Sequence, residues 1–403
     1  MITLADIEDA QDRIADLATV TPLDHSGTFS TLTGADVHAK LEIFQRTGAF
    51  KIRGAANRIR TLSPSERDSG VITASAGNHA QGVALAAAES DVDATVVMPE
   101  DAAISKVAAT RSYGATVRLE GTDYAAAQEA AYRIADAENR TYVHAFDDPA
   151  VMAGQGTIGL EILAALPTVD TVIVPIGGGG LISGIATAIK ATSPETRVVG
   201  VQAAGAASVP ESLDQGSIVE RDSVDTIADG IATRRIGDLA FEVIAQHVDE
   251  VVTITDDQIA NTVTHLLERS KIVVEPAGAA GLAALVGGEI DYAENEVIVP
   301  VLSGGNVDLN VLTTVILRGL VETGRYVKLR TVLKDQPGAL EELSGIIGNY
   351  GANIFAIRHD RTSKDVAMNR AEVELEVETR GPTHVEELIN GLESRGYVVD
   401  RHA

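Results

Sequence analysis

The sequence feature that most constrains the fold is a run of four glycines, Gly177–Gly180, between an apolar segment and a helical pattern. The apolar segment, Val172–Ile176, has the length and composition of a buried strand, and Leu181–Ala191 reads as a helix. Four consecutive glycines lose too much chain entropy to serve as an ordinary turn. Their backbone N–H groups can approach an anion at the positive end of the helix dipole, so the run predicts a phosphate site.

The glycine run does not match the common nucleotide-binding loops. A Walker loop requires Gly-Lys-Ser/Thr, which does not follow here. The dinucleotide fingerprint requires Gly-x-Gly-x-x-Gly and an acidic residue near the end of the next strand. The glycine spacing differs, and the next expected strand, Val198–Gln202, ends in glutamine. The run therefore favours a monophosphate ligand.

The order of strand, turn and helix repeats along the chain. Val71–Ala74 leads into Ser75–His79 and then into an alanine-rich helix. Further strands are expected at Ala94–Pro99, Ala115–Leu119 and Glu296–Leu302. Strands that alternate with helices form a parallel sheet covered on both faces. The sequence therefore predicts an α/β fold with a parallel-sheet core.

The pattern changes after Thr323. Val327–Lys334 and Ala371–Glu378 alternate between apolar and polar residues, as half-buried antiparallel strands do. With a helix at Pro337–Tyr350 and another after Thr383, the order of elements is βαββαβ. This order predicts a separate C-terminal domain of ferredoxin-like type.

Composition and charge exclude several classes of protein. The 403 residues contain no cysteine, which removes disulfides, thiolate catalysis and cysteine-based metal sites. The formal net charge of −26 argues against nucleic acid and anionic membranes as partners. The sequence has no transmembrane-length apolar run and no signal-peptide pattern, so we expect a cytoplasmic protein. The dispersed acidic residues with few lysines are typical of adaptation to high cytoplasmic salt.

A candidate nucleophile lies in the segment Glu42–Ala55. Lys51 follows Ala49-Phe50 and precedes Ile52, an apolar frame that can desolvate the amine and lower its pKa. A desolvated lysine is suited to form a Schiff base with a carbonyl group. The alternative is an ordinary surface lysine at the start of an amphipathic helix, and this segment alone favours that alternative.

Two more segments lie, like the glycine run, at the ends of expected strands. Ser75–His79 offers free N–H groups to a substrate carboxylate, and Asn78 can hydrogen-bond a phenolic oxygen. His79 taken alone fits a packed helix residue. Ser303, in Ser303-Gly304-Gly305-Asn306, can hydrogen-bond a ring nitrogen, or it can belong to a simple turn. Ligands bind outside the carboxyl ends of parallel strands, so we expect these segments to share one site.

Together these segments resemble the fold-type II pyridoxal phosphate enzymes, specifically the threonine ammonia-lyases, from about Pro22 to the C-terminus. The matching motifs are the lysine motif Thr47–Gly54, the asparagine loop Ser75–Gln81, the phosphate loop Gly177–Leu181 and the pyridine-nitrogen serine Ser303. Val274–Gly278 is similar to family sequence near the cofactor ring. Leu333–Leu340 is similar to an ACT domain, a module that binds amino acids and regulates enzymes.

The resemblance implies pyridoxal 5′-phosphate as the cofactor. No metal-binding residue is expected, and a requirement for a monovalent cation stays open. Lys51 would be the catalytic residue, which carries the cofactor and removes the Cα proton. The residues that would bind the cofactor are Lys51, Phe50, Asn78, Gly177, Gly178, Gly179, Gly180, Leu181, Glu275 and Ser303. The residues that would bind the amino-acid substrate are Ser75, Ala76, Gly77, Asn78 and His79.

The resemblance also implies domains and a reaction. The fold would be tryptophan synthase β-like, with a large catalytic domain at 1–41 and 145–322, a small one at 42–144, and an ACT domain at 326–403. The implied reaction is β-elimination of L-threonine to 2-oxobutanoate and ammonia, with L-serine giving pyruvate. Its implied role is the first step of isoleucine synthesis or threonine breakdown, in a homodimer or homotetramer.

The expected effector site lies in the ACT domain. Isoleucine is expected to bind there and lower activity, with valine opposing it. The residues expected at this site are Pro337, Gly338, Asn353 and Ile354. The alternative is an ACT domain that only pairs two chains.

Other activities stay open at this point. A serine racemase of the same fold needs a second base, which that family supplies with a serine where this chain has Ala76. Its divalent cation site also differs, because Gln202 and Ser208 stand where carboxylates are expected. A cysteine or cystathionine synthase fits the motifs less well. A non-catalytic amino-acid sensor is disfavoured by the intact Lys51 and Asn78.

Overall fold

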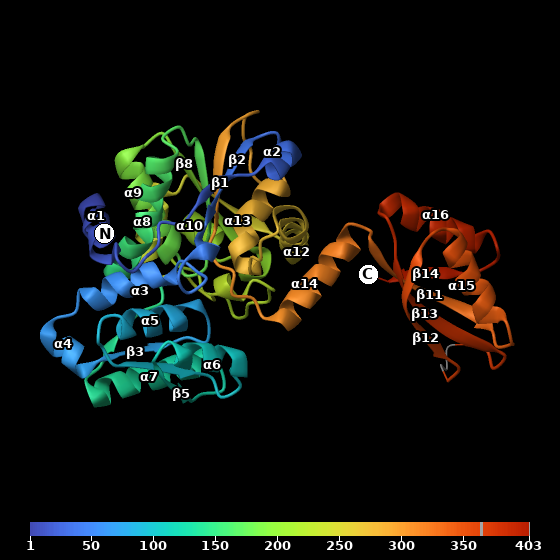
Figure 1. The fold of residues 1–403 in the computed structure, drawn as a ribbon, viewed down its shortest axis with the longest axis horizontal. Helices are drawn as coiled ribbons and strands as arrows, with labels where there is room; N and C mark the ends of the chain where they lie inside the picture. Colours follow the sequence, from blue (N-terminus) through green and yellow to red (C-terminus); the bar gives the residue numbers. More distant parts are fainter. Residues whose placement is uncertain (363–365, 403) are drawn as a thin grey trace. The chain divides into compact units, whose positions relative to one another are not determined.

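The protein was analysed as a computed structural model, which describes residues 1–362 and 366–402. The chain divides into two compact units, Met1–Asp308 and Leu309–Ala403. The first unit contains two mainly parallel sheets with helices on their faces, and the second contains one antiparallel sheet with helices (Figure 1). None of the helices in the described part of the chain is long and apolar enough to cross a membrane.

The large sheet of the first unit has six strands in the spatial order β1-β2-β10-β7-β8-β9. Only β1 runs antiparallel to its neighbour. The strands are β1 (Leu23–His25), β2 (Asp36–Leu41), β7 (Thr171–Pro175), β8 (Arg197–Ala203), β9 (Glu250–Ile254) and β10 (Val297–Leu302). β7 is buried throughout, as expected for a parallel strand covered on both faces.

Helices cover both faces of the large sheet. Val172 and Val174 of β7 share a buried cluster with α8 and α9, while Ile173 faces Gly281 of α13. The helices of this part are α1 (Leu4–Ile14), α2 (Gly27–Thr33), α8 (Pro149–Ala165), α9 (Gly180–Thr192), α10 (Val209–Gln215), α11 (Asp238–His247), α12 (Asp256–His265) and α13 (Pro276–Val286). Short helical turns lie at Glu42–Phe44, Ala204–Ala206, Asp229–Ile231 and Leu266–Ser270.

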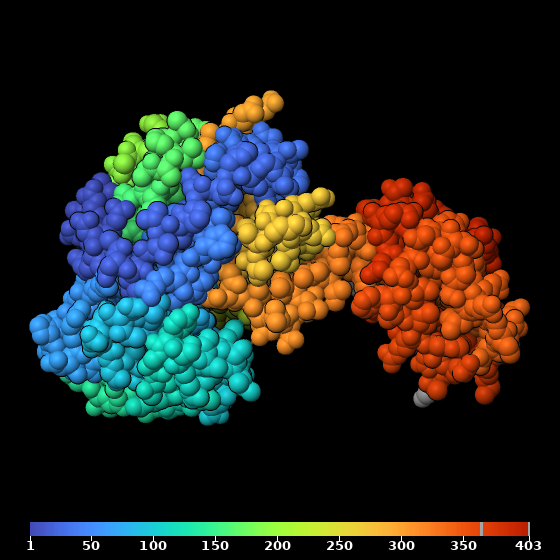
Figure 2. Space-filling view, viewed as in Figure 1, coloured from blue at the N-terminus to red at the C-terminus, as the bar shows by residue number. Residues whose placement is uncertain are grey.

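The small sheet has four parallel strands in the order β5-β4-β3-β6. They are β3 (Val71–Ala74), β4 (Ala94–Met98), β5 (Thr116–Leu119) and β6 (Thr141–Tyr142). Its helices are α3 (Lys51–Arg60), α4 (Pro64–Ser69), α5 (Asn78–Ala88), α6 (Ile104–Ser112) and α7 (Tyr124–Glu138). In the space-filling view, the residues of this sheet gather in one lobe of the first unit (Figure 2).

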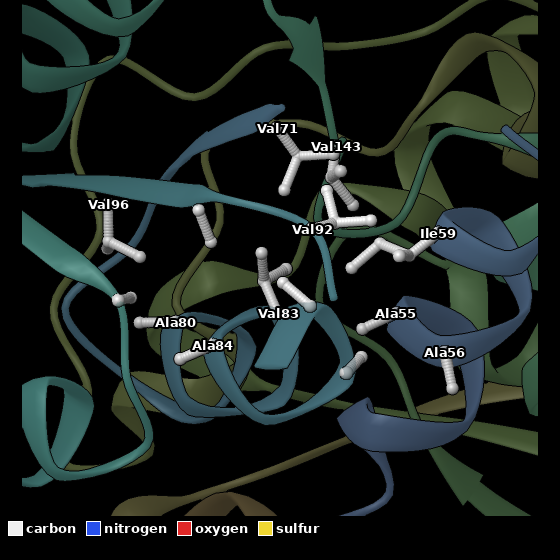
Figure 3. Packing of buried hydrophobic residues seen from close by; sticks show 14 of the residues in the cluster. Ala55, Ala56, Ile59, Val71, Ala80, Val83, Ala84, Val92, Val96 and Val143 are labelled. Carbon is white, nitrogen blue, oxygen red and sulfur yellow. The ribbon is translucent and has the colours of Figure 1, made fainter. Parts of the chain in front are cut away.

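The core of this lobe places helix α3 against α5. Side chains of α3, α5, β3 and β4 point into one buried cluster (Figure 3). The two helices approach most closely at Gly82 of α5, where an added Cβ would lie 3.1 Å from the backbone of Lys51. On the other face of the sheet, Ile72 and Val97 pack against α7. The packing therefore fixes the first turn of α3, where Lys51 lies.

The second unit has the predicted βαββαβ order. Its antiparallel sheet has the spatial order β12-β13-β11-β14, and Leu329, Val373, Leu343 and Leu388 share its core. The elements are α14 (Leu309–Glu322), β11 (Tyr326–Lys334), α15 (Ala339–Asn349), β12 (Asn353–Asp360), β13 (Arg370–Glu378), α16 (Pro382–Glu393) and β14 (Val399–His402). The ferredoxin-like fold is confirmed.

The start of one helix differs from the sequence analysis by two residues. α15 begins at Ala339 and not at Pro337, because Gly338 has φ +86° and forms the N-cap. Helix α14 is grouped with the second unit, whereas the sequence analysis assigned 309–322 to the large catalytic domain. The division at Asp308 does not separate the two catalytic domains from each other, so their boundaries stay a prediction.

Candidate active site

The predicted site segments follow strands of both sheets. Ser75–His79 follows β3, Gly177–Gly180 follows β7, and Ser303 follows β10. Lys51 begins α3 next to the last of these, since the N–H group of Phe50 donates to the carbonyl oxygen of Ser303 at 3.1 Å. Ala49 and Gly304 also form an antiparallel bridge. The lysine and serine segments are therefore joined through their backbones.

Lys51 carries an amine without a hydrogen-bonded carboxylate. Its Nζ atom donates to the carbonyl oxygen of Ala145 at 2.8 Å and lies 5.0 Å from the ring centre of Phe50. Burial lowers the pKa of Lys51 to about 8, and the negative charge of Glu275 partly opposes this shift. Near physiological pH the neutral amine is therefore a minority form, but it is far more abundant than in a lysine of ordinary pKa, which favours a role as nucleophile or base.

Three side chains connect the separate segments. The Asn78 amide donates to Glu275 Oε1 at 2.8 Å. Asn306 donates to Asn78 Oδ1 at 2.9 Å and to the carbonyl oxygen of Thr47 at 2.6 Å. The network ties the lysine motif, the asparagine loop and the serine segment together. It therefore fixes which way the amide of Asn78 faces.

Glu275 is the acidic member of this network. Burial raises its pKa to about 7, while the hydrogen bond from Asn78 and the positive charges of Lys106 and Lys51 lower it. The carboxyl group can therefore exchange a proton near neutral pH. The backbone is close as well, because a Cβ added at Gly304 would lie 2.4 Å from Glu275 Oε1.

The glycine loop is packed so tightly that side chains are excluded. A Cβ added at Gly178 would lie 2.4 Å from ring atoms of Phe146, and one at Gly180 would lie 2.5 Å from the carbonyl oxygen of Phe146. Gly179 has φ +93°, which L-residues with side chains rarely adopt. Because α9 begins at Gly180, the N–H groups of its first turn lack helical acceptors. The loop therefore offers the donors and the dipole that a phosphate group needs.

The glycine loop is linked to Lys51 through one segment. Ala145 accepts the hydrogen bond from Lys51, and the next residue, Phe146, packs against Gly178. Leu181 is buried in α9 directly after the loop. A cofactor phosphate at the loop and a cofactor carbonyl at Lys51 would thus be held on two sides of the same segment.

The asparagine loop is partly buried at Ser75, Ala76 and Gly77. The Ser75 hydroxyl accepts a hydrogen bond from the N–H group of Gly77 at 3.1 Å. His79 lies deeper, with Nε2 3.1 Å from the carbonyl oxygen of Val143, and burial lowers its pKa to about 3. The buried, neutral ring supports the packed-residue alternative for His79.

The region of the racemase-type cation site contains no carboxylate at the two expected positions. Gln202 is buried, and its Oε1 atom accepts hydrogen bonds from the N–H groups of Ser208 at 3.1 Å and Val209 at 2.8 Å. Gln202 thus satisfies the start of α10, a role for which a neutral amide suffices.

The residues present fit pyridoxal 5′-phosphate. The loop at Gly177–Gly180 is a cradle that a Cβ would fill, Lys51 supplies an amine of lowered pKa, and Ser303 supplies a neutral hydroxyl. Asn306, Ala145 and Phe146 were missed as site residues. The signal for Asn306 was present, because it ends the Ser-Gly-Gly-Asn segment, whereas no local pattern marked Ala145 or Phe146.

The chain is similar to known proteins in sequence and in structure. Residues 14–304 match the family model described as pyridoxal-phosphate dependent enzyme. The chain is 47% identical to an L-threonine ammonia-lyase of Thermotoga maritima over 99% of both chains.

Solved structures with the same fold are also similar. A threonine deaminase of Solanum lycopersicum has 39% identity and a TM-score of 0.75, with 77% of this chain and 86% of that chain covered. A maize serine racemase has 37% identity and a TM-score of 0.75, with 79% and 98% covered. The family match spans most of the first unit and includes Lys51, Asn78, the glycine loop, Glu275 and Ser303, but it ends before Asn306. The chain belongs to the family of pyridoxal-phosphate-dependent enzymes.

Proposed function

We propose that the protein is an L-threonine ammonia-lyase, which converts L-threonine to 2-oxobutanoate and ammonia and L-serine to pyruvate. The observation that carries the proposal is Lys51, an amine with a pKa of about 8 placed between the Asn78 network and the glycine loop. The similarity to an L-threonine ammonia-lyase over 99% of the chain supports the same reaction.

The side chains divide the work of the reaction. The bound cofactor supplies a carbonyl that condenses with amines and a ring that takes up the electron pair left at Cα. Lys51 holds the cofactor and, once its amine is free, removes the Cα proton of the substrate. The asparagine loop, Ser75–His79, holds the substrate carboxylate at the start of α5. Ser303 would supply a neutral hydroxyl to the ring nitrogen of the bound cofactor, which would leave that nitrogen unprotonated and limit transamination.

An assay of keto-acid formation tests the activity. Purified full-length enzyme with the cofactor is mixed with L-threonine or L-serine in high-salt buffer, because the dispersed acidic surface suits high salt. We expect 2-oxobutanoate or pyruvate together with equimolar ammonia. Reduction with borohydride followed by peptide mapping is expected to label Lys51. A label on another lysine, or no keto acid from either amino acid, would contradict the proposal.

The second candidate is serine racemisation, which the similarity to a maize serine racemase brings into consideration. Racemisation requires a base on each face of Cα. Ala76 occupies the position of the second base in that family and carries no proton-transferring group. We therefore expect chiral chromatography to detect pyruvate from L-serine and negligible D-serine. Substantial D-serine would reveal a second base at another position.

We propose that the C-terminal unit regulates the enzyme by binding isoleucine, the end product of the pathway that this reaction would begin. Gly338 caps α15, whose first turn can bind a carboxylate, and the exposed Pro337 precedes it. Asn353 and Ile354 open β12, with Ile354 packed against the core of this unit. Isoleucine is expected to lower activity through a coupling of about 1–3 kcal/mol, and valine to oppose it.

Truncation separates regulation from simple pairing of the C-terminal units. An enzyme ending before Tyr326 is expected to stay active at sub-saturating threonine and to ignore isoleucine. If isoleucine leaves the full-length enzyme unchanged, the regulatory proposal fails and pairing of chains is the better role. Inhibition that persists after truncation would assign the effector to the first unit.

Two further features belong to the proposal. The segment 42–144 is proposed to close over the substrate, which would exclude water during the reaction. The enzyme is proposed to work as a homodimer or homotetramer. Light scattering of the full-length and truncated enzymes tests the second feature, since pairing through the C-terminal unit predicts a smaller assembly after truncation.

A further inference from the structure

Three potential metal ligands meet on the antiparallel strands β1 and β2, at an edge of the large sheet. His25 of β1 lies directly opposite His38 of β2, and Asp36 precedes His38 by two residues, on the same face of the strand. The Nε2 atoms of His25 and His38 lie 3.3 and 3.1 Å from the same oxygen, Oδ1 of Asp36. In the described part of the chain, this group brings three donor atoms within 4.8 Å of one another.

We propose that His25, Asp36 and His38 bind a divalent transition-metal ion of the Zn²⁺ type. Zn²⁺ binds imidazole nitrogen and carboxylate oxygen at about 2.0–2.2 Å, and donors around a tetrahedral ion are then roughly 3.4 Å apart. The observed separations of 3.1 and 3.3 Å are close to that value. Two of the three donor pairs therefore already have about the spacing of a tetrahedral site, and the third pair lies within 4.8 Å.

The donor set selects the class of ion. Two imidazoles suit Zn²⁺, Ni²⁺ or Cu²⁺, whereas Ca²⁺ and Mg²⁺ prefer all-oxygen sites. Side-chain exposures of 54% for His25 and 43% for Asp36 leave room for water as a fourth ligand. In the absence of an ion, each imidazole can donate one hydrogen bond to Asp36, so the same three side chains are also stable as a hydrogen-bonded cluster.

The location assigns a structural role to the ion. Asp36 begins β2, whereas the candidate active site follows the opposite, carboxyl ends of β7 and β10. The ion would join β1, a strand of only three residues, to β2 across the loop that contains helix α2 (Figure 1). Because β2 pairs with the central strand β10, an ion here would fix the edge of the large sheet.

Calorimetric titration tests the site directly. Tag-free, full-length, cofactor-loaded protein is titrated with Zn²⁺, and Co²⁺ serves as a spectroscopic probe of the ligand geometry. We expect one ion per chain at this site and a Co²⁺ spectrum of tetrahedral type. The variants His25→Gln and His38→Gln are each expected to weaken binding more than tenfold, since loss of second-shell partners alone costs about 10–100-fold.

Two controls make the test decisive. His247→Gln changes a histidine of α11, outside the cluster, and is expected to keep the affinity of the unchanged protein. Asp36→Asn retains the size of the side chain and is expected to weaken Zn²⁺ binding without unfolding the chain. Zn²⁺ should also raise the melting temperature of the unchanged protein and of His247→Gln, but not that of His25→Gln/His38→Gln.

The proposal is overturned by either of two results. One is the absence of stoichiometric Zn²⁺ and Co²⁺ binding to the unchanged protein. The other is equal affinity in His25→Gln, His38→Gln and the His247→Gln control, which would move the ion elsewhere. Neither result depends on threonine deamination, so the metal site is tested separately from the enzymatic activity.

Discussion

Two regions of the first unit each contain a lysine in the interior, but one lysine is hydrogen-bonded to a carboxylate and the other is not. Lys40 on β2 is 1% exposed and donates to Glu161 Oε2 at 2.5 Å and to the carbonyl oxygen of Thr21 at 2.7 Å. Lys51 on α3 donates to the carbonyl oxygen of Ala145 and has no hydrogen-bonded carboxylate among its pKa determinants. Whether a lysine in the interior is reactive therefore depends on its hydrogen-bond partner as well as on its burial.

The region around Lys40 extends into a buried network of charges. Arg53 donates to Glu161 Oε1 at 2.6 Å and to Glu42 at 2.8 and 2.9 Å. Thr21 donates to Glu42 Oε1, which also accepts one of the hydrogen bonds from Arg53. Arg53 and Lys51 belong to the same helix, α3, so a cation hydrogen-bonded to two carboxylates lies close in the chain to an amine whose hydrogen bond goes to a backbone carbonyl. Loss of one member of a buried ion pair destabilises the fold, whereas an amine without a hydrogen-bonded carboxylate remains available for chemistry.

The largest expected effect is that of Lys51→Ala on activity. Removal of the amine deletes both the attachment of the cofactor and the base, so keto-acid formation from threonine is expected to fall by about 10⁴-fold or more. The variant should stay folded, because the alanine leaves no charge unpaired. Steady-state kinetics and circular dichroism check the two statements. Activity within tenfold of the unchanged enzyme would show that another group acts as base.

Lys40→Met should produce the reverse pattern. The change removes a partner of Glu161, and loss of one member of a buried ion pair costs about 3–5 kcal/mol of stability. We expect a loss of stability near the lower end of this range, because Arg53 still pairs with Glu161. Activity per folded molecule should be retained.

Denaturant unfolding of Lys40→Met beside Arg46→Met provides the measurement. Arg46 and its partner Glu89 are 39% and 42% exposed, so that control should lose at most about 1 kcal/mol. Equal losses of stability in the two variants would show that the buried pair of Lys40 and Glu161 contributes no more than an exposed ion pair. A kinetic defect in folded Lys40→Met would show that the charge network also influences the chemistry.

The third prediction is a pH dependence of stability in the cofactor-free protein. The pKa of Lys51 is lowered from 10.5 to about 8 on folding, so between these values the unfolded chain binds one more proton than the folded chain. Stability therefore rises with pH in this window, relative to Lys51→Met. Below pH 8, burial of the Lys51 ammonium lowers the free energy of unfolding, and this cost disappears as the pH rises towards 10.5.

Paired unfolding curves of the two proteins at pH 7.5 and 10.5 measure this effect. The stability gap is expected to close by about 2 kcal/mol, after allowance for partial exposure of the lysine. A gap that stays constant with pH would mean that the Lys51 ammonium is fully solvated.

The smallest expected effect is that of Glu275→Gln on the titration of Lys51. The Glu275 charge raises the pKa of Lys51, so its removal should lower that pKa further. The glutamine oxygen can still accept the hydrogen bond from Asn78. The rate of Lys51 modification by an amine-selective reagent, followed against pH by peptide mapping, should shift to lower pH. A shift to higher pH would reverse the assigned sign of this interaction.

The parts of the site that were predictable from sequence are those with a local pattern. Gly177–Gly180 follows an apolar strand and Lys51 has an apolar frame, so both are recognisable without knowledge of the fold. Glu275 was expected near the cofactor from the family resemblance, but its raised pKa depends on burial that only the folded chain produces. The order of elements was also predictable from local patterns, because the apolar residues of strands and helices recur with different periods.

The rest depends on contacts between distant segments. The ring of Phe146 fills the space that a side chain at position 178 would need, but nothing near Phe146 in sequence indicates this. Arg53 and Glu161 lie on different helices, and their pairing follows only from the packing of α3 against α8. The start of α15 was misplaced because Pro337 fits a first helical turn, whereas the positive φ of Gly338 decides the boundary.

The burial of Arg53 and Glu42 has a consequence for the response to ionic strength. Mobile ions screen charges over about 3 Å at 1 M salt, but only where they can approach them. Exposed pairs such as Arg133–Glu120, with exposures of 65% and 44%, lose most of their attraction under those conditions. Arg53 and Glu42 are 1% and 0% exposed, so dissolved ions cannot come between them. The ion pair between Arg53 and Glu42, which holds helix α3 in place, should therefore contribute the same stability at low and at high salt concentration.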